Sequence, residues 1–385
     1  MKRREFIEYG MLGSAAFLSH LVLLNLKPSR ASLSADMNNK QRYDWIFLYW
    51  MPYDNDLSDF GAPIMNMIAS GVRSENILVV VESDFWDAKQ LSRSVISKGK
   101  INTQKLDTAN SASEEVFADY LNWAQSRFET DRWVIVFLGH GGQLDEISPD
   151  EHPGSSLVGT QWMNIKKLSD AIANFNQQIN NRVELFFFQN CNKGALEAHY
   201  TFRDTAKYTL SSQKLLGAPN YYYESLFQFI GNHPELNGEQ LAQKIRQFEG
   251  GDMYHSYTVT NNRSFSEIPE TFNSFIDSIL SANFKLIDTK ELHKYYYFAE
   301  QHVDLVEFCK TITQQSGADP KKCNDVIECF NNSLIHMVNP LERQENLSGL
   351  GLFLPLKRKQ LDKYRYLPIY SDLKLIELFD AILLD

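Results

Sequence analysis

The sequence predicts an α/β fold in which a mostly parallel central sheet lies between layers of helices, with a smaller, more helical C-terminal part. One observation is four short, almost continuous apolar runs, at 43–51, 76–84, 132–142 and 183–191. Such runs are typical of strands that are buried on both faces. The other is apolar residues at helical spacing between these runs, at 113–128 and 165–179. Strands that alternate with helices indicate parallel pairing.

The second half of the chain continues this pattern with more helix. A fifth strand is expected at 208–213, and a strand punctuated by Gly and Pro at 347–356. Helices are expected at 221–248, 269–283, 288–316 and 322–338. The helical pattern breaks near residue 250, which we take as the boundary between a main core (36–250) and a C-terminal part (251–385). That C-terminal part is expected to complete the sheet and to add a helical subdomain.

Composition excludes several classes of protein. The chain has 385 residues, a formal net charge of -10 and 43% hydrophobic residues, which is enough for a packed core and excludes a disordered chain. The acidic balance disfavours a nucleic-acid-binding protein, which needs a basic face for the phosphates. The sequence contains neither a P-loop nor a dinucleotide-binding glycine pattern, and no Cys/His spacing typical of a metal site. No cofactor is therefore expected.

Residues 1–35 have the layout of an export signal. A basic start is followed by an apolar stretch at 9–26 and by small and polar residues up to residue 35. The pair Arg3-Arg4 is similar to a twin-arginine signal. We therefore expect a periplasmic or secreted protein. The alternative is an uncleaved membrane anchor, because the apolar stretch is almost long enough to span a bilayer.

The four cysteines fall into two settings. Cys309, Cys323 and Cys329 are close in sequence, and export would permit one disulfide among them, although the sequence does not say between which pair. Cys191 is far from the others and ends an apolar run.

Cys191 and His140 carry the chemistry that the sequence predicts. Each lies at the carboxyl end of an expected parallel strand, and the carboxyl ends of such strands meet at one edge of the sheet. A histidine can take the proton of a thiol and later protonate a leaving amine. Glycines after the histidine, Gly141 and Gly142, let backbone N–H groups approach an oxyanion. Taken alone, a buried cysteine is more often a packing residue and a histidine more often a satisfied polar residue.

Six ordered segments resemble the clostripain-like cysteine peptidases, family C11, which are similar to caspases in fold. They are 49–61, 137–142 (FLGHGG), 190–200, 210–223, 302–308 and 348–355. The segment Gln189-Asn190-Cys191 is also similar to the Gln-Ala-Cys of caspases, whose histidine lies about 50 residues upstream. The resemblance implies a caspase-like αβα sandwich whose catalytic core is 36–250.

The resemblance also implies roles for individual residues. Cys191 would be the nucleophile and His140 the general base and acid. The backbone N–H groups of Gly141 and Cys191 would form the oxyanion hole. The partner would be a peptide or protein substrate, and a monomer is expected.

The substrate-binding residues are likewise carried over from the family. Ser211, Ser212 and Gln213 would pair with extended substrate by β-augmentation. The family has acidic residues that hold Arg or Lys before the scissile bond, whereas this chain has Gln189 and Pro219 at those positions. A buried cation without a counter-charge is costly, so we expect a neutral or polar residue there, without the Arg or Lys preference of relatives.

Asp54, Asn55 and Asp56 follow the first strand and allow two interpretations. They could support the substrate pocket or hold a calcium ion, because oxygen ligands suit that metal. Alternatively, they cap the helix that follows, which is the interpretation we favour.

Three functions therefore compete. The first is an exported cysteine endopeptidase that uses Cys191 and His140. The second is a catalytically inactive caspase-like binding module, which the missing pocket acids suggest. The third is an acyltransferase that uses the same pair and resolves the acyl-enzyme with an amine.

Overall fold

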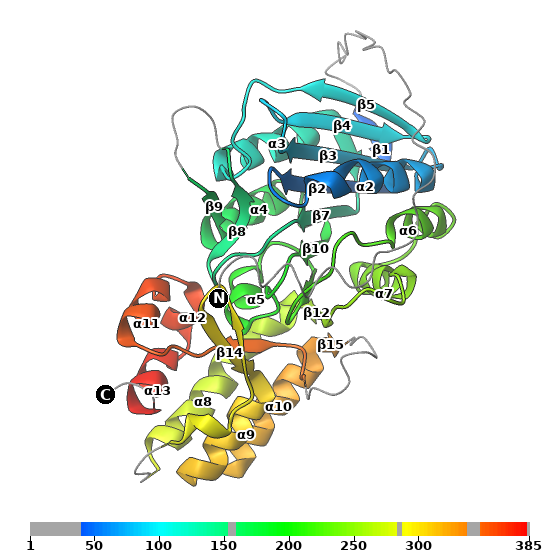
Figure 1. Ribbon diagram of the computed structural model, residues 1–385. Coiled ribbons are helices and arrows are strands. Elements are labelled where there is room, and N and C mark those ends of the chain that lie inside the picture. Colours follow the sequence, from blue (N-terminus) through cyan, green and yellow to red (C-terminus); the bar gives the residue numbers. More distant parts are fainter. Residues whose placement is uncertain (1–39, 153–158, 283–286, 337–346, 383–385) are drawn as a thin grey trace.

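A nine-stranded sheet forms the centre of the molecule (Figure 1), in the order β15-β12-β11-β10-β7-β2-β3-β4-β5. The computed structural model describes residues 40–152, 159–282, 287–336 and 347–382. The strands are β2 (Trp45–Tyr53), β3 (Ile77–Phe85), β4 (Ser92–Ser97), β5 (Lys100–Lys105), β7 (Trp133–Leu138), β10 (Val183–Gln189), β11 (Tyr208–Ser212), β12 (Tyr257–Asn261) and β15 (Leu334–His336). The five strands from β11 to β3 pair in parallel, and the outer pairings are antiparallel. The predicted α/β fold with a mostly parallel sheet is confirmed.

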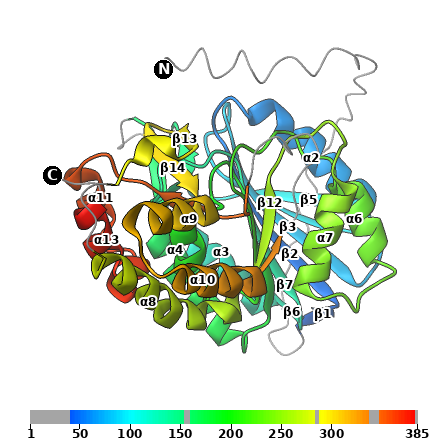
Figure 2. The same ribbon diagram turned by 90° about the horizontal axis from the view of Figure 1, so that it is seen from below.

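Helices cover both faces of this sheet (Figure 2). One face carries α2 (Ser58–Gly71), α6 (Tyr223–Ile230) and α7 (Gly238–Phe248); the other carries α3 (Glu114–Arg127), α4 (Ile165–Gln178) and α5 (Leu196–Thr201). Strand β2 is buried along its whole length and divides its side chains between the two layers. Trp45 and Phe47 pack in the core on one face, and Ile46 and Leu48 in the core on the other. This alternation explains the continuous apolar run.

Side-chain caps fix where α3 and α4 begin, close to the predicted positions. The Ser113 side chain accepts a hydrogen bond from the Val116 backbone N–H. The Asn164 side chain accepts from the N–H groups of Lys166 and Lys167. Each cap satisfies donors that the first helical turn leaves without an internal partner.

The C-terminal half mixes helices with short strands. Its helices are α8 (Ile268–Leu280), α9 (Leu305–Ser316), α10 (Pro320–Ser333), α11 (Arg358–Tyr364), α12 (Pro368–Asp372) and α13 (Leu375–Ile382). A second sheet contains β13 (Lys294–Tyr297), β14 (Glu300–Asp304) and β16 (Gly351–Phe353). Two further small sheets pair β1 (Gln41–Tyr43) with β6 (Phe128–Thr130) and β8 (Glu146–Asp150) with β9 (Gln161–Asn164).

Three predicted helices were wrong in part. The helix predicted at 288–316 begins only at Leu305, because the preceding residues form the β13–β14 hairpin. The hairpin turns at Phe298 and Ala299, which have φ of 47° and 62°. Such turns usually contain Asn and Gly, so the usual sequence signal is absent. The helix predicted at 221–248 is divided into α6 and α7, and the helix predicted at 322–338 ends at Ser333, where β15 follows. The β4–β5 hairpin was not predicted.

The disulfide that export would permit among the C-terminal cysteines is not formed, because all four cysteines are free thiols. Cys309 on α9 and Cys323 on α10 are buried as apolar side chains in the core. Burial raises the pKa of the Cys309 thiol well above its usual value, which is typical of an inert packing cysteine.

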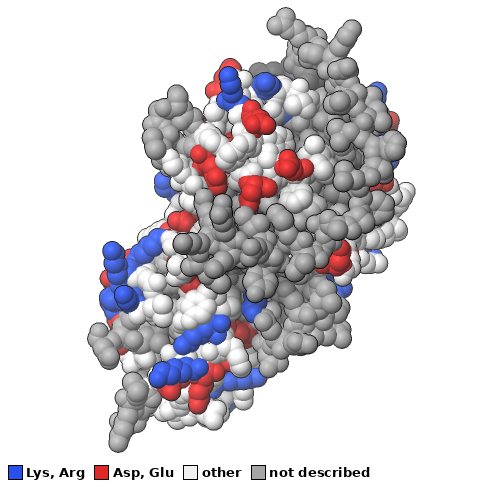
Figure 3. All heavy atoms as spheres, viewed as in Figure 1, with Lys and Arg blue, Asp and Glu red and all other residues white. Residues whose placement is uncertain are grey.

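The surface of the described residues carries charges of both signs. On the face shown in Figure 3, acidic and basic side chains are interspersed. Among the described residues, no helix is both long and apolar enough to cross a membrane. Residues 1–35, with the predicted export signal, lie outside the described part of the chain.

Asp304 anchors the C-terminal sheet to the core. Its carboxylate, which is almost fully buried, caps α9 by accepting from the N–H groups of Val306 and Glu307. The other oxygen accepts from the Gln213 amide at 3.1 Å and from Ser348.

We expect Asp304→Ala to lower stability by about 3 kcal/mol, because it removes a helix cap and leaves buried donors without an acceptor. Thermal unfolding measures the loss. Asp288→Ala is the matched control, because Asp288 also caps a helical turn but is exposed. Equal shifts in Tm for the two variants would contradict this account.

Candidate active site

The register of β7 and β10 sets His140 and Cys191 at the same level. Leu138, the last residue of β7, pairs with Gln189, the last residue of β10. His140 and Cys191 each follow two residues later, on neighbouring loops at the carboxyl edge of the sheet, as the sequence predicts.

The two loops are in direct contact. The Asn190 side chain donates to the Gly139 carbonyl oxygen at 2.8 Å. A Cβ atom built on Gly141 would lie 2.4 Å from the Cys191 carbonyl oxygen, so no side chain fits there. Glycine at 141 therefore lets the histidine loop approach the cysteine loop. The residues predicted for the oxyanion hole, Gly141 and Cys191, lie at this contact.

The Cys191 thiol is half-buried and lies against the segment that follows β11. Its sulfur is 3.6 Å from the Leu216 carbonyl oxygen and accepts from the Leu216 N–H at 3.4 Å. The phenol of Tyr297, at the end of β13, also hydrogen-bonds with the thiol. Burial raises the pKa of Cys191, although Leu216, Tyr297 and the nearby Lys193 cation oppose the rise. The thiol is thus in its neutral form near pH 7.

His140 forms its hydrogen bond with a different partner. Its Nε2 atom lies 2.7 Å from Oδ1 of Asp56, in the loop after β2. Among the residues that the structure describes, no hydrogen bond joins His140 to Cys191. Catalytic contacts of this kind are often loose in the absence of substrate and tighten when it binds. From the sequence, Asp56 was expected to cap the helix, to support the pocket or to hold calcium, and its contact with His140 was not predicted.

Lys193, which was also not predicted from the sequence, links the cysteine loop to the histidine loop. It is fully buried, and its Nζ donates to the Gln143 carbonyl oxygen at 2.7 Å. Burial lowers the pKa of Lys193 to about 8, while nearby carboxylates, Glu300 first, oppose the fall. Glu300 in turn accepts from the Leu144 N–H at 2.7 Å. A lysine two residues beyond the nucleophile was the available sequence signal.

Gln189 is held in a neutral hydrogen-bond network. Its amide nitrogen donates to Asn220 and to the Tyr223 hydroxyl, each at 2.6 Å. Its amide oxygen accepts from Tyr222 at 2.7 Å. All four residues are buried.

A carboxylate that the sequence analysis missed lies behind this network. Glu249 accepts from the Asn220 side chain at 2.8 Å and from the Tyr221 N–H at 2.7 Å. It also accepts from the N–H of Gly250 and from the Tyr257 hydroxyl. Burial raises the pKa of Glu249. Pro219, which lies beside Asn220 in sequence, is partly exposed.

Ser211, Ser212 and Gln213 do not line an open groove, which corrects the prediction that substrate pairs with them. All three are fully buried, and β11 pairs with β10 on one side and β12 on the other. The Ser211 hydroxyl contacts His199, Ser212 contacts Ser256, and Gln213 contacts Asp304. Strand β12 comes from beyond residue 250, so the sequence pattern around β11 did not reveal this pairing.

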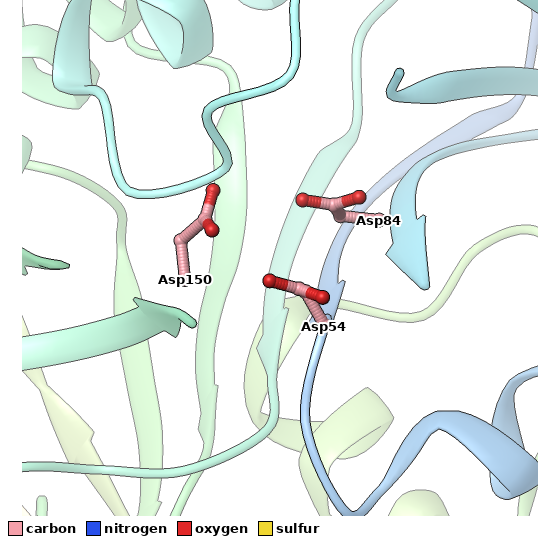
Figure 4. Close-up of side chains that lie close together, drawn as sticks. All are labelled: Asp54, Asp84 and Asp150. Carbon is pink, nitrogen blue, oxygen red and sulfur yellow. The ribbon is translucent and has the colours of Figure 1, made fainter. Parts of the chain in front are cut away.

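Asp54, Asn55 and Asp56 point to three different places, so they do not form the calcium set that was considered. Asn55 forms the predicted local turn, with its side-chain oxygen accepting from the Leu57 N–H. Asp54 instead meets Asp84 and Asp150 (Figure 4), with carboxylate oxygens within 4.8 Å of one another.

The three carboxylates of this cluster are buried, and their negative charges repel one another. Burial, followed by the charges of Asp150 and Asp54, raises the pKa of Asp84 to about 8. Burial also raises the pKa of Asp150 to about 6. His152 contacts Asp54 through Nδ1 at 2.8 Å. Oxygen ligands of this kind suit a divalent cation such as calcium.

The raised pKa of Asp84 predicts how stability depends on pH. Between the usual value of 3.8 and about 8, the folded protein binds more protons at Asp84 than the unfolded chain does. Stability therefore falls as pH rises through this range. We expect Asp84→Asn to raise Tm by about 2–4 °C at pH 8 and to have no effect near pH 4.

Thermal melts across this pH range check the expectation. A variant that lowers Tm at pH 8 would contradict it. Repeating the melts with added calcium tests for a cation, since a rise in Tm that Asp84→Asn abolishes would assign one to the cluster.

Comparisons with known proteins identify the family. A match to the clostripain family, peptidase family C11, covers residues 49–375. Clostripain from Hathewaya histolytica is 22% identical over 428 residues, which cover 88% of this chain and 80% of that protein.

Two solved structures share the fold. An inactive zymogen of a C11 protease from Parabacteroides distasonis has a TM-score of 0.64 at 18% identity, covering 86% of this chain and 98% of that one. A secreted C11 cysteine protease from Bacteroides thetaiotaomicron, in complex with an irreversible peptide inhibitor, has a TM-score of 0.63 at 19% identity, covering 86% and 99%. The predicted caspase-like sandwich is thus confirmed, and the chain belongs to the clostripain family of cysteine-type endopeptidases.

Proposed function

We propose that this protein hydrolyses peptide bonds with Cys191 as nucleophile and His140 as general base and acid. The contact between the two loops carries the proposal. Only a glycine at position 141 can lie this close to the Cys191 backbone, because a Cβ atom there would clash with it. Nucleophile and base therefore leave the sheet side by side, at the edge where parallel α/β sheets hold their ligands.

The reaction proceeds in two halves. His140 takes the thiol proton while the Cys191 sulfur attacks the scissile carbonyl carbon, and the carbonyl oxygen becomes an oxyanion. Backbone N–H groups of Gly141 and Cys191 stabilise that charge. The protonated His140 then gives its proton to the leaving amine, which departs and leaves a thioester on Cys191. Water, deprotonated by His140, hydrolyses the thioester and regenerates the thiol. No metal or organic cofactor takes part in these steps.

The resting thiol must change its contacts before this reaction starts. It now lies against the Leu216 backbone and Tyr297 rather than His140. Substrate that pairs with the segment around Leu216 would compete for those backbone groups and free the sulfur to turn toward His140. The same resting contacts also favour the rival function, a catalytically inactive binding module.

We propose that the residue before the scissile bond is neutral or polar. The amide of Gln189 offers no counter-charge, and the nearby Glu249 carboxylate accepts four hydrogen bonds from groups of the protein. A substrate cation would have to replace donors that are already bonded, which costs free energy.

We also propose export, with residues 1–35 as the signal and a monomer in the periplasm or medium. The layout of the sequence at 1–35 supports export. The Bacteroides relative described above is a secreted protein.

A peptide library tests the proposed activity. The chain without residues 1–35, its Cys191→Ala variant and its His140→Ala variant are incubated with the same library under reducing conditions. Mass spectrometry should find cuts made by the native chain and none by either variant. Cuts that persist in Cys191→Ala would contradict the assignment of the nucleophile, and the absence of any cut would favour the binding module.

The same library tests the neutral pocket. Gln189→Glu should raise kcat/KM for substrates with Arg or Lys before the scissile bond by about tenfold or more, because a charge-assisted hydrogen bond contributes about 1.5–3 kcal/mol. Asn220→Asp places a carboxylate one step farther back and serves as the comparison. A native chain that already prefers Arg or Lys would contradict the proposal.

A further inference from the structure

We propose that Asp56 is the positioning residue of His140, so that the reaction uses Cys191, His140 and Asp56 together. The inference rests on the proposed function. The observation that supports it is the 2.7 Å contact between Oδ1 of Asp56 and Nε2 of His140. The histidine has no hydrogen bond to the cysteine in the described part of the chain, so this contact is what orients its ring.

The chemistry of the contact determines which nitrogen of His140 acts as the base. An ionised carboxylate can only accept a hydrogen bond, so Nε2 carries the proton and its N–H donates a hydrogen bond to Asp56. Nδ1 is then the nitrogen with a free lone pair. The carboxylate thereby selects the tautomer that can receive the Cys191 proton. It also lies beside the positive charge that forms on the ring when that proton arrives.

The backbone of Asp56 is held in place from both sides, although its side chain is exposed. Asp54 and Asn55 are both buried. The Asn55 side chain donates to the Pro52 carbonyl oxygen at 3.0 Å, and its backbone oxygen accepts from Ser58 N–H. His152 contacts Asp54 at 2.8 Å. These contacts hold the backbone from which the Asp56 carboxylate reaches His140.

The size of the effect follows from exposure. The side chain of Asp56 is 62% exposed and that of His140 is 32% exposed, so solvent screens the attraction between them. Orientation and tautomer selection then contribute more than charge. We expect loss of the contact to lower kcat by about tenfold, which is less than a fully buried carboxylate contributes in triads of this kind.

A competing role for Asp56 is general support of the adjacent helix. Acidic residues near a helix N-terminus stabilise it through the helix dipole, and Asp56 lies just before α2. Asp59 is also exposed and lies in the first turn of α2. Asp59→Ala therefore removes the same charge from the same helix end without touching His140, and it is the matched control.

The experiment compares native protein with Asp56→Ala, Asp56→Asn and Asp59→Ala, by kcat, KM, Tm and the rate at which a peptidyl chloromethyl ketone, which occupies the substrate site as it reacts, alkylates Cys191. Asp56→Ala should lower kcat about tenfold and slow alkylation, with KM and Tm unchanged. Asp56→Asn should recover part of both rates, because its amide oxygen can still accept from Nε2. Asp59→Ala should behave as the native protein. This pattern separates positioning of the base from support of the fold.

Two outcomes would overturn the inference. One is equal kcat in Asp56→Ala and Asp59→Ala; the other is a loss in Asp56→Ala that is matched by a fall in Tm and that Asp56→Asn does not recover. Should the native protein cut no peptide, the proposed function fails, and alkylation still decides the inference. Equal alkylation rates in native protein and Asp56→Ala overturn it, and slower alkylation in Asp56→Ala supports it.

Discussion

The parallel pairing of β7 with β10 is the constraint on which the site depends. Because Leu138 pairs with Gln189, strands β7 and β10 end at the same level, and the loops that follow them begin side by side. A slip of one residue in this register would reverse the faces of every side chain on one strand. The buried apolar strands and their helical layers hold this register. The small residue at 141 then lets the two loops touch.

Next to this contact, charged side chains connect the two loops. Lys193 reaches from the cysteine loop to the Gln143 carbonyl, and Glu300 on β14 accepts from Leu144. The C-terminal half is thus connected to the histidine loop, and through Tyr297 it also covers the thiol. A buried charge without its partner costs several kcal/mol, so these contacts join the two halves of the chain into one site.

The sequence was most informative where a single local pattern determines structure. Apolar runs and helical spacing predicted the parallel strands, α3 and α4, and the strand-end positions of His140 and Cys191. It was least informative where a distant segment decides. Strand β12 buries Ser211 to Gln213, and Glu249 reaches the Gln189 network from 60 residues away in sequence. The β13–β14 turn lacks its usual residues, so no local signal separated it from helix.

Asp56 illustrates the same limit at the level of one contact. Its position after a strand suggested a cap, and its neighbour Asn55 does form the local turn. Only the spatial proximity of the loops after β2 and β7 brings its carboxylate to His140. Local propensity thus accounts for the backbone of this loop, and tertiary arrangement accounts for its chemistry.

The central claim is that a peptide bond is broken through a thioester on Cys191, and trapping that intermediate tests it most directly. The enzyme is mixed with an activated peptide ester that acylates it faster than the acyl-enzyme is hydrolysed. The reaction is quenched in acid, and the protein is analysed by intact mass and peptide mapping. We expect a mass increase equal to the acyl group, located on Cys191 and absent from His140→Ala. Turnover without an adduct, or an adduct on another residue such as Cys329, would contradict it.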